Sequence, residues 1–329
     1  MKVLRVTVAV ILTFCILFTA FYGSGKIVDG GVDTTPSEYK GILTLWQVDT
    51  FEGGVGSRKQ FLLKSARGFE KQNQGVLVMV INHTAKSVKE NLDKGVFPDM
   101  ISYGAGLNIS GMSELNVMRV IDGGKVGGKV YATAWCRGGY VLIKNPKITI
   151  ETDVIDNLLV SQSEFTQPLT AFTLSGYFVN NVEVLKPMDA YVKFTGGKVK
   201  YFLGTQRDLN RLNAREFEYE ITPLDGYNDL FQYVSVTATD QTKRYYSEKF
   251  IEYLISDAVQ SKLNTIGMFS PFIDVKYENA QLYAMQLSNT GKTVSAFTAP
   301  EVLNEMQDLS LQATLGNKEA LNKIKNLLL

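Results

Sequence analysis

Apolar residues follow two different rhythms along this chain of 329 residues. Short runs rich in Val, Ile and Leu and bounded by Gly, Pro, Asn or Asp predict strands, whereas apolar residues three or four positions apart predict helices. Up to residue 103 the two rhythms alternate. The predicted elements are strands at 42–48, 76–82 and 99–103 and helices at 57–73 and 84–94. Strands joined through helices need right-handed crossovers, so this pattern predicts a parallel sheet.

The rest of the chain is less regular. Two strand-like runs, 130–135 and 139–143, are separated by Cys136-Arg137-Gly138, and we interpret this break as a passage between two lobes. Short helical patches follow in 151–195, and the run 231–237 is a candidate second crossing. The further predicted elements are strands at 198–203 and 216–222, a helix after residue 208, a long helix from Asp240, and helices at 300–315 and 318–328.

The N-terminus has the layout of an export signal. Lys2 and Arg5 precede an uninterrupted weakly polar run over 6–22, and small residues follow at 23–25. The run is at the short edge of the ~17–25 residues that a membrane helix needs, so cleavage near Gly25 and retention as an anchor both stay open. The large residues before Cys15 argue against lipidation there. Residues 26–39 lack periodicity and predict a flexible tether.

Charge and size narrow the class of protein. Without Lys2 and Arg5, 34 basic residues become 32 against 33 acidic ones, a net charge of −1 that favours neither nucleic acid nor an anionic membrane. About 300 residues are more than one compact core usually holds, which predicts two lobes. Only Cys136 remains after residue 25, so stability must come from packing and not from a disulfide.

The chain lacks the residues of the common catalytic and cofactor sites. Its single histidine, His83, excludes metal sites built from several histidines, and no Gly-x-Ser-x-Gly segment supplies a nucleophile for it. We expect His83 to be an ordinary strand-end residue. Gly291-Lys292-Thr293 resembles the end of a phosphate-binding loop, but Gln286 stands where that loop needs its first glycine. We therefore expect no metal and no cofactor.

Two features keep alternatives open. Carboxylate pairs for glycoside hydrolysis can be assembled from Asp49, Glu52, Asp99 and Asp208, although a chain with 33 acidic residues always offers some pair. The loop Gly53-Gly54-Val55-Gly56 lacks the spacing of a dinucleotide fingerprint. It is either a tight turn into the following helix or a turn whose backbone N–H groups also face a ligand.

A series of segments spread over almost the whole chain after residue 40 carries a family resemblance. The segments are Leu43-Thr44-Leu45-Trp46 with its Gly-rich loop, 69–76, Phe97-Pro98-Asp99-Met100-Ile101, 129–135, 197–204, Thr222-Pro223-Leu224-Asp225-Gly226, 250–254 and 266–271. In order and spacing they resemble the extracellular solute-binding proteins of bacterial ABC importers, in the group of the maltose- and other sugar-binding proteins.

The resemblance implies an α/β fold of the two-lobed, periplasmic-binding-protein type (type II), with a ligand cleft between lobes joined by crossing segments. The first lobe would comprise 40–134 and 236–285, and the second 135–235 and 286–329. The stretch between Ile143 and Val199 is shorter than is usual for the family, and the lipid-anchoring cysteine is missing. A trimmed second lobe would imply a smaller cleft or fewer contacts to the ligand.

Ligands of open parallel sheets bind beyond the carboxyl ends of the strands, where loops and helix N-termini converge. This rule selects Asp49, Thr50, Glu52 and Gly53 after the first strand, Ser102 and Tyr103 after the third, Trp135 and Arg137 at the crossing, and Thr205, Gln206, Arg207 and Asp208 in the second lobe. Carboxylates accept hydrogen bonds from sugar hydroxyls, and aromatic rings cover apolar sugar faces.

Other roles stay open for several of these residues. Trp135 and Tyr103 also suit a hinge or a core, and Trp46 suits a core. Arg137 and Arg207 are either ligand donors or members of ion pairs between the lobes. Many sugar-binding relatives have an aromatic residue where this chain has Gln206, which weakens the assignment to carbohydrate.

The sequence therefore predicts an exported receptor that does no chemistry. We expect a monomer at the extracellular face of the membrane or in the periplasm, with anchoring by residues 6–22 left open. It would capture a small molecule, a sugar or oligosaccharide, by lobe closure and deliver it to the transmembrane subunits of an ABC permease. The alternatives are a membrane-anchored sensor with the same fold and a surface enzyme that acts on polysaccharide.

Overall fold

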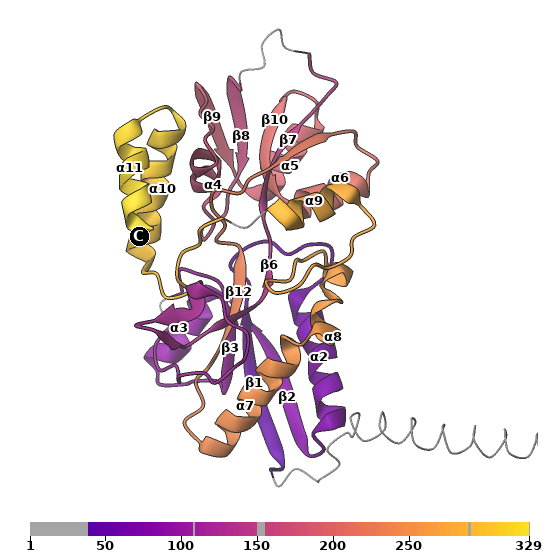
Figure 1. Ribbon diagram of the computed structural model, residues 1–329, viewed down its shortest axis with the longest axis vertical. Helices are drawn as coiled ribbons and strands as arrows, with labels where there is room; N and C mark the ends of the chain where they lie inside the picture. The colour runs from indigo at the N-terminus through magenta and orange to yellow at the C-terminus, as the bar shows by residue number, and fades with distance from the viewer. Residues whose placement is uncertain (1–38, 108, 150–154, 289–290, 329) are drawn as a thin grey trace, which may run out of the picture.

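The computed structural model describes residues 39–107, 109–149, 155–288 and 291–328. Its two five-stranded sheets lie end to end (Figure 1), and a two-stranded sheet is formed by a small hairpin. The predicted export segment (1–25) and all but the last residue of the predicted tether (26–39) lie outside these residues. Within the described ranges, no helix is long and apolar enough to cross a membrane.

The first sheet has five strands in the order β2-β1-β3-β12-β6. Strand β1 pairs in parallel with β2 and β3, whereas β12 is antiparallel to both β3 and β6. The parallel arrangement predicted for the first three strands is confirmed. The bounds are β1 Gly41–Val48, β2 Val76–His83, β3 Met100–Tyr103, β6 Thr133–Arg137 and β12 Phe231–Val236.

Three of the helices of this lobe follow a residue whose side chain caps them. They are α2 Arg58–Gln72, α3 Ala85–Asp93 and α7 Gln241–Leu254, followed by α8 Asp257–Gln260 and the 3-10 turn η2 Leu263–Ile266. The side chains of Ser57, Thr84 and Asp240 accept hydrogen bonds from backbone N–H groups of the first turns of α2, α3 and α7. Each such cap satisfies a donor that the helix cannot, and stabilises it by about 1 kcal/mol.

The second sheet also has five strands, in the order β11-β7-β10-β8-β9. Strand β7 is antiparallel to β10 and β11, whereas β10, β8 and β9 run in parallel. Strands β8 and β9 fall in the stretch 151–195, where the sequence predicted only helical patches. The elements are β7 Tyr140–Lys144, β8 Asn157–Ser161, α4 Pro168–Leu174, β9 Asn181–Leu185, α5 Pro187–Thr195, β10 Tyr201–Thr205, α6 Gln206–Asn213 and β11 Glu220–Pro223.

The C-terminal helices cover the second lobe. The α10–α11 hairpin lies beside α4, and α9 lies near α6 (Figure 1). Both helices of the hairpin were predicted from sequence, whereas the predicted strand at 130–135 is split between β5 and β6. The remaining elements are α9 Ala280–Ser288, α10 Pro300–Thr314, α11 Lys318–Leu327, the 3-10 turn η1 Asp122–Gly124 and the small hairpin of β4 Lys125–Val126 and β5 Lys129–Val130.

The chain passes between the sheets after β6, as the break at Cys136-Arg137-Gly138 predicted. It returns through 224–230, just before β12, and leaves again through 267–279, between η2 and α9. Strand pairing places β6 up to Arg137 and β12 from Phe231 in the first sheet, whereas the sequence placed 135–235 in the second lobe. We therefore propose that the first lobe includes β6 up to Arg137 and β12 from Phe231, and that the chain between these two strands belongs to the second lobe and its connections.

The Gly-rich turn after β1 allows two loops of the first lobe to approach closely. A Cβ atom on Gly54 would lie 2.2 Å from the carbonyl oxygen of Ile266, at the end of η2. The N–H of Val55, the next residue, donates to that same oxygen at 3.0 Å. Glycine at position 54 is therefore explained by backbone contact within the protein, which is the tight-turn interpretation of this loop.

Candidate functional site

A cavity of about 630 Å³ lies between the two lobes. The first lobe contributes the loop from Asp49 to Arg58, which connects β1 to α2. The second lobe contributes Ser163, Glu164 and Phe165, which follow β8, and Arg207 in the first turn of α6. Most of these groups are polar, and both halves of the molecule line the cavity.

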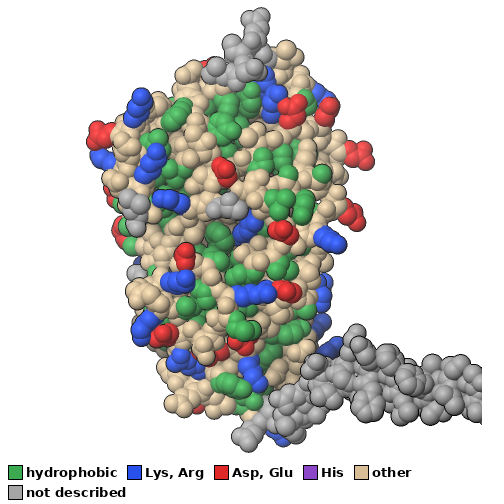
Figure 2. All heavy atoms as spheres, in the orientation of Figure 1, with side chains coloured by type: hydrophobic (Ala, Val, Ile, Leu, Met, Phe, Trp, Pro, Cys, Tyr) green, Lys and Arg blue, Asp and Glu red, His purple; other side chains and the backbone are tan. Residues whose placement is uncertain are grey.

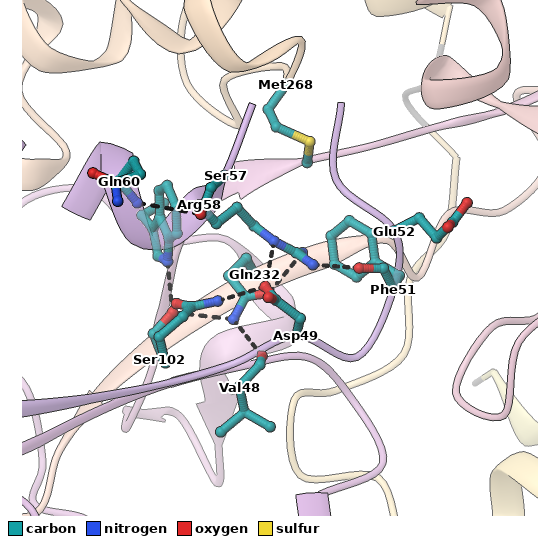
Figure 3. A network of polar contacts seen from close by, with 12 residues as sticks. Val48, Asp49, Phe51, Glu52, Ser57, Arg58, Gln60, Ser102, Gln232 and Met268 are labelled. Atoms are coloured by element: carbon teal, nitrogen blue, oxygen red, sulfur yellow. Dashed lines mark hydrogen bonds and ion pairs between the residues drawn. The ribbon is translucent and has the colours of Figure 1, made fainter. Parts of the chain in front are cut away.

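Arg58 forms the base of the first-lobe loop (Figure 3). Its side chain is only 3% exposed, and its Nε lies 2.7 Å from Oδ1 of Asp49. Nη1 donates to Oε1 of Gln232 at 2.9 Å, and Nη2 donates to the carbonyl oxygen of Phe51. The guanidinium also lies 4.3 Å from the centre of the Phe51 ring. One buried cation thus fixes both Asp49 and the loop that carries Glu52.

A second layer of buried polar groups holds Gln232 in place (Figure 3). Its Nε2 donates to the carbonyl oxygen of Val48 at 3.0 Å and to Oγ of Ser102 at 3.1 Å. Nε1 of Trp135 donates to the same hydroxyl at 2.8 Å. Ser102 and Trp135 are completely buried. They therefore lie beneath the Arg58 layer, with their hydrogen-bonding groups already paired.

Glu52 connects the lobes. Its Oε1 lies 3.2 Å from Nη1 of Arg207, and its Oε2 lies 3.8 Å from Nη1 of Arg211. Both arginines belong to α6 of the second lobe, and the Glu52 and Arg207 side chains are each about one-third exposed. Such pairs are worth about 0–1 kcal/mol each, because water and salt screen them. The ion pairs therefore favour closure only weakly.

The N-terminus of α6 is held by side chains selected as site residues. Thr205 caps the helix, and its N–H donates to Oδ2 of Asp208 at 2.9 Å. Burial raises the pKa of Asp208 to about 6. Gln206 is buried as well, and its Oε1 accepts from the N–H of Gly139 at 3.0 Å, on the chain's first passage between the lobes.

The selected residues therefore fall into two groups. The residues that line the interlobe cavity are Asp49, Thr50, Glu52, Gly53 and Arg207. Those outside it are Ser102, Tyr103, Trp135, Arg137, Thr205, Gln206 and Asp208. Tyr103 is buried in the first lobe, with its hydroxyl 3.0 Å from Oγ of Ser235, and Arg137 lines a different cavity. A role in ligand binding stays a prediction for every one of them.

The sequence did not select seven other side chains that line the cavity. They are Phe51, Val55, Ser57, Arg58, Ser163, Glu164 and Phe165. Residues 163–165 follow β8. If the sequence analysis had recognised that strand, the strand-end rule would have selected them as candidate ligand-binding residues. Arg58 carried no such signal, because only the folded chain brings Gln232, 174 positions later, to its guanidinium.

His83 has an ordinary structural environment. Its ring centre lies 4.4 Å from that of Trp46, and Nδ1 lies 3.1 Å from Oγ of Ser87, which takes part in the cap of α3. Burial lowers the pKa of His83. The strand-end role expected for this histidine agrees with these contacts, and no group of metal-binding side chains occurs among the described residues.

No protein-family model matches this sequence, and no curated protein matches it. Its structure, however, is similar to solved structures of sugar receptors. A cyclo/maltodextrin-binding protein complexed with maltotetraose has a TM-score of 0.57 at 15% identity, and the match covers 89% of this chain and 97% of that one. The GacH receptor of Streptomyces glaucescens GLA.O, solved unliganded and with acarbose, has a TM-score of 0.58 at 14% identity, covering 88% and 99%.

At this low identity the likeness defines the fold. The chain has the two-lobed α/β periplasmic-binding fold of type II, as found in maltodextrin-binding proteins, and the fold predicted from the order of the sequence segments is confirmed. The match extends over nearly the full length of both solved proteins, so both lobes take part in it.

A buried carboxyl group lies on the return passage between the lobes. Asp229 is 5% exposed, and Oδ1 accepts from the hydroxyl of Tyr140 at 2.8 Å. The N–H of Gln167 donates to that hydroxyl at 2.8 Å. Among the described residues Asp229 makes no ion pair, and burial raises its pKa to about 7. The neutral acid is therefore the form that suits this site.

Replacing Arg58 should loosen the loop that lines the cavity. Arg58→Met leaves the Gln232 Oε1 and the Phe51 carbonyl without their donor, and we expect a loss of about 2–4 kcal/mol in the free energy of unfolding. Arg67→Met is the matched control, because Arg67 is an exposed residue of the same helix. Urea unfolding measures both variants. Equal stability of the two would contradict the role assigned to Arg58.

Asp229 should make stability depend on pH. An unfolded Asp ionises near pH 4, whereas the native one ionises near pH 7, so the native state retains a proton that the unfolded state has lost. The contribution of Asp229 to the free energy of unfolding is therefore fully present below about pH 4 and is lost as the pH rises to about 7.

The variant Asp229→Asn should remove the pH dependence of the free energy of unfolding that Asp229 causes. Its amide oxygen can still accept the hydrogen bond from the Tyr140 hydroxyl. We expect it to gain stability relative to the original chain as the pH rises from 4 to 7, by up to about 1.4 kcal/mol per pKa unit. Asp225→Asn, at an exposed position on the same passage, is the control and should leave the slope unchanged. Unfolding curves at several pH values test this prediction. If the free energy of unfolding changes equally with pH in the original chain and in Asp229→Asn, the prediction is refuted.

Proposed function

We propose that this protein is an exported solute-binding receptor that captures a sugar or oligosaccharide between its lobes and delivers it to an ABC permease. The observation that supports this most directly is the cavity of about 630 Å³ lined by loops of both lobes. Closure of the lobes would surround a solute on two sides and replace its water with polar side chains.

The groups around the cavity suit a ligand with many hydroxyls. Asp49 is 49% exposed, and the contacts from Arg58 and Gln47 both use Oδ1, so none of the described residues donates to Oδ2. Glu164 is exposed and makes no ion pair within the described part of the chain. Both carboxylates are available as acceptors for hydroxyl groups, and the Phe165 ring adds an apolar surface.

Three further observations agree with this function. Two proteins with this fold bind maltotetraose and acarbose. Positive and negative side chains are mixed over the face drawn in Figure 2, without a broad patch of one sign that would suit nucleic acid. The apolar run at 6–22 is typical of an export signal or anchor, which would place the receptor at the extracytoplasmic face of the membrane. Its partners would be the transmembrane subunits of a permease, and it would act as a monomer.

A binding screen tests the proposal. Maltotetraose, monosaccharides, amino acids and glycerol phosphate are offered to the full chain while its unfolding temperature is recorded. We expect a carbohydrate to stabilise the protein increasingly with the logarithm of its concentration, by about 2.7 kcal/mol at one hundred times the dissociation constant. The same carbohydrate should be recovered unchanged. Stabilisation by an amino acid alone, or release of sugar from a polymer that Asp49→Asn abolishes, would contradict a sugar receptor.

A pair of variants then locates the site. Glu164→Ala removes an acceptor at the cavity and should weaken binding about tenfold, since hydrogen bonds to charged groups contribute about 1.5–3 kcal/mol. Glu90→Ala, at an exposed position of α3 outside the cavity, should bind like the original chain. Titration calorimetry compares the two. Unchanged affinity in Glu164→Ala would place the ligand elsewhere.

A further inference from the structure

A second cavity, of about 520 Å³, lies where the chain passes between the lobes. It shares no residue with the cavity described above. Arg137 at the end of β6 and Phe231 at the start of β12 line it, together with Pro271 of the third passage. The segment from Gly291 to Ser295 completes much of the wall.

Arg137 is a buried cation that makes no ion pair among the described residues, although the charge of the Asp274 carboxylate acts on it and favours its protonated form. It is 8% exposed, and its Nε and Nη2 donate to the carbonyl oxygens of Ser270 and Gln286 at 3.2 and 2.6 Å. Nη1 is buried and has no hydrogen-bond partner among the described residues, and no carboxylate of these residues forms an ion pair with the guanidinium. Burial lowers the pKa of Arg137 to about 10. A buried, unpaired charge is costly, so its presence beside a cavity calls for a compensating anion.

Lys292 adds a second positive charge to this cavity. Its side chain is exposed, and it makes no ion pair within the described ranges. Its backbone is fixed, because the N–H of Asn228 donates to the Lys292 carbonyl oxygen at 2.8 Å. A Cβ atom on Gly291 would lie 2.1 Å from the carbonyl oxygen of Asp225, so glycine is needed for this approach. The segment Gly291-Lys292-Thr293 thus presents a lysine at the cavity without wrapping a phosphate.

The remaining lining does not cancel these charges. Asp122 is the acidic residue among those that line the cavity, and Nζ of Lys125 lies 2.8 Å from its Oδ1. The Asp122 side chain is almost fully exposed, at 96%. Thr293 and Ser295 contribute hydroxyl groups to the wall. The cavity therefore combines two cations that make no ion pair among the described residues. The two hydroxyl groups donate to the carbonyl oxygens of Val294 and Gly123 within the protein.

We propose that this cavity is a binding site for a small oxyanion, a carboxylate or phosphate group, which Arg137 and Lys292 hold together. Charge-assisted hydrogen bonds from a guanidinium are strong and directional, and the free Nη1 supplies such a donor. The volume admits an organic anion larger than inorganic phosphate. Because the two cavities share no residue, this site does not depend on the proposed sugar site, and either can fail alone.

Titration calorimetry on the full chain tests the site with two probes, inorganic phosphate and citrate, at constant ionic strength with chloride as the reference. We expect saturable binding of at least one probe, and the comparison of the two identifies which oxyanion source the cavity takes. Absence of saturable heat with both probes would overturn the proposal.

Variants show whether any binding belongs to this cavity. Lys292→Gln should weaken binding about tenfold, which corresponds to about 1.4 kcal/mol, and Lys292→Glu should abolish it. Both change an exposed side chain, so the circular dichroism spectrum and unfolding temperature should be preserved. Lys276→Gln, at an exposed lysine of the third passage that does not line the cavity, should bind like the original chain. Equal binding by Lys292→Glu and the original chain, or an equal loss in Lys276→Gln, would place the anion elsewhere.

Discussion

The geometry of the interlobe cavity depends on one buried guanidinium. Arg58 opens helix α2, yet its side chain turns beneath the preceding loop and contacts Asp49, Phe51 and Gln232. Without this cation the Phe51 carbonyl and the Gln232 Oε1 would lose their donor, and Asp49 would keep only the contact from Gln47. The cost of burying a charge is offset here by several hydrogen bonds made at once, which also leave little freedom for the loop. This wall of the interlobe cavity is therefore fixed by contacts within the protein.

Behind this wall the polar contacts pass from strand to strand. Gln232 on β12 contacts Ser102 on β3, and Trp135 on β6 donates to the same hydroxyl. Three neighbouring strands of the first sheet are thereby connected at their ends toward the second lobe. The opposite wall is anchored in a similar way, because Gln206 at the start of α6 accepts a hydrogen bond from the N–H of Gly139. Two rigid walls joined by weak ion pairs are what closure by a small solute requires.

The sequence predicted the first lobe well because periodicity and capping agree there: Ser57, Thr84 and Asp240 each precede a clear helical pattern and cap it in the structure. It predicted the second lobe less well. Strand β9 is a largely exposed edge strand and gives a weak pattern, whereas β8 holds the short buried run Leu158-Leu159-Val160, which the sequence analysis did not recognise as a strand. The strand-end rule located the loops, but it does not specify which way a side chain points. Ser102 and Trp135 stand at such ends and face each other instead of the cavity.

The central claim is that a solute binds between the two loops that line the interlobe cavity. Hydrogen–deuterium exchange, with and without the carbohydrate that most stabilises the protein, measures this directly. The account predicts slower exchange in three places together: the loop 49–58 of the first lobe, residues 163–165 of the second, and the start of α6 around Arg207. Protection confined to one lobe, or protection that avoids all three segments, would contradict it.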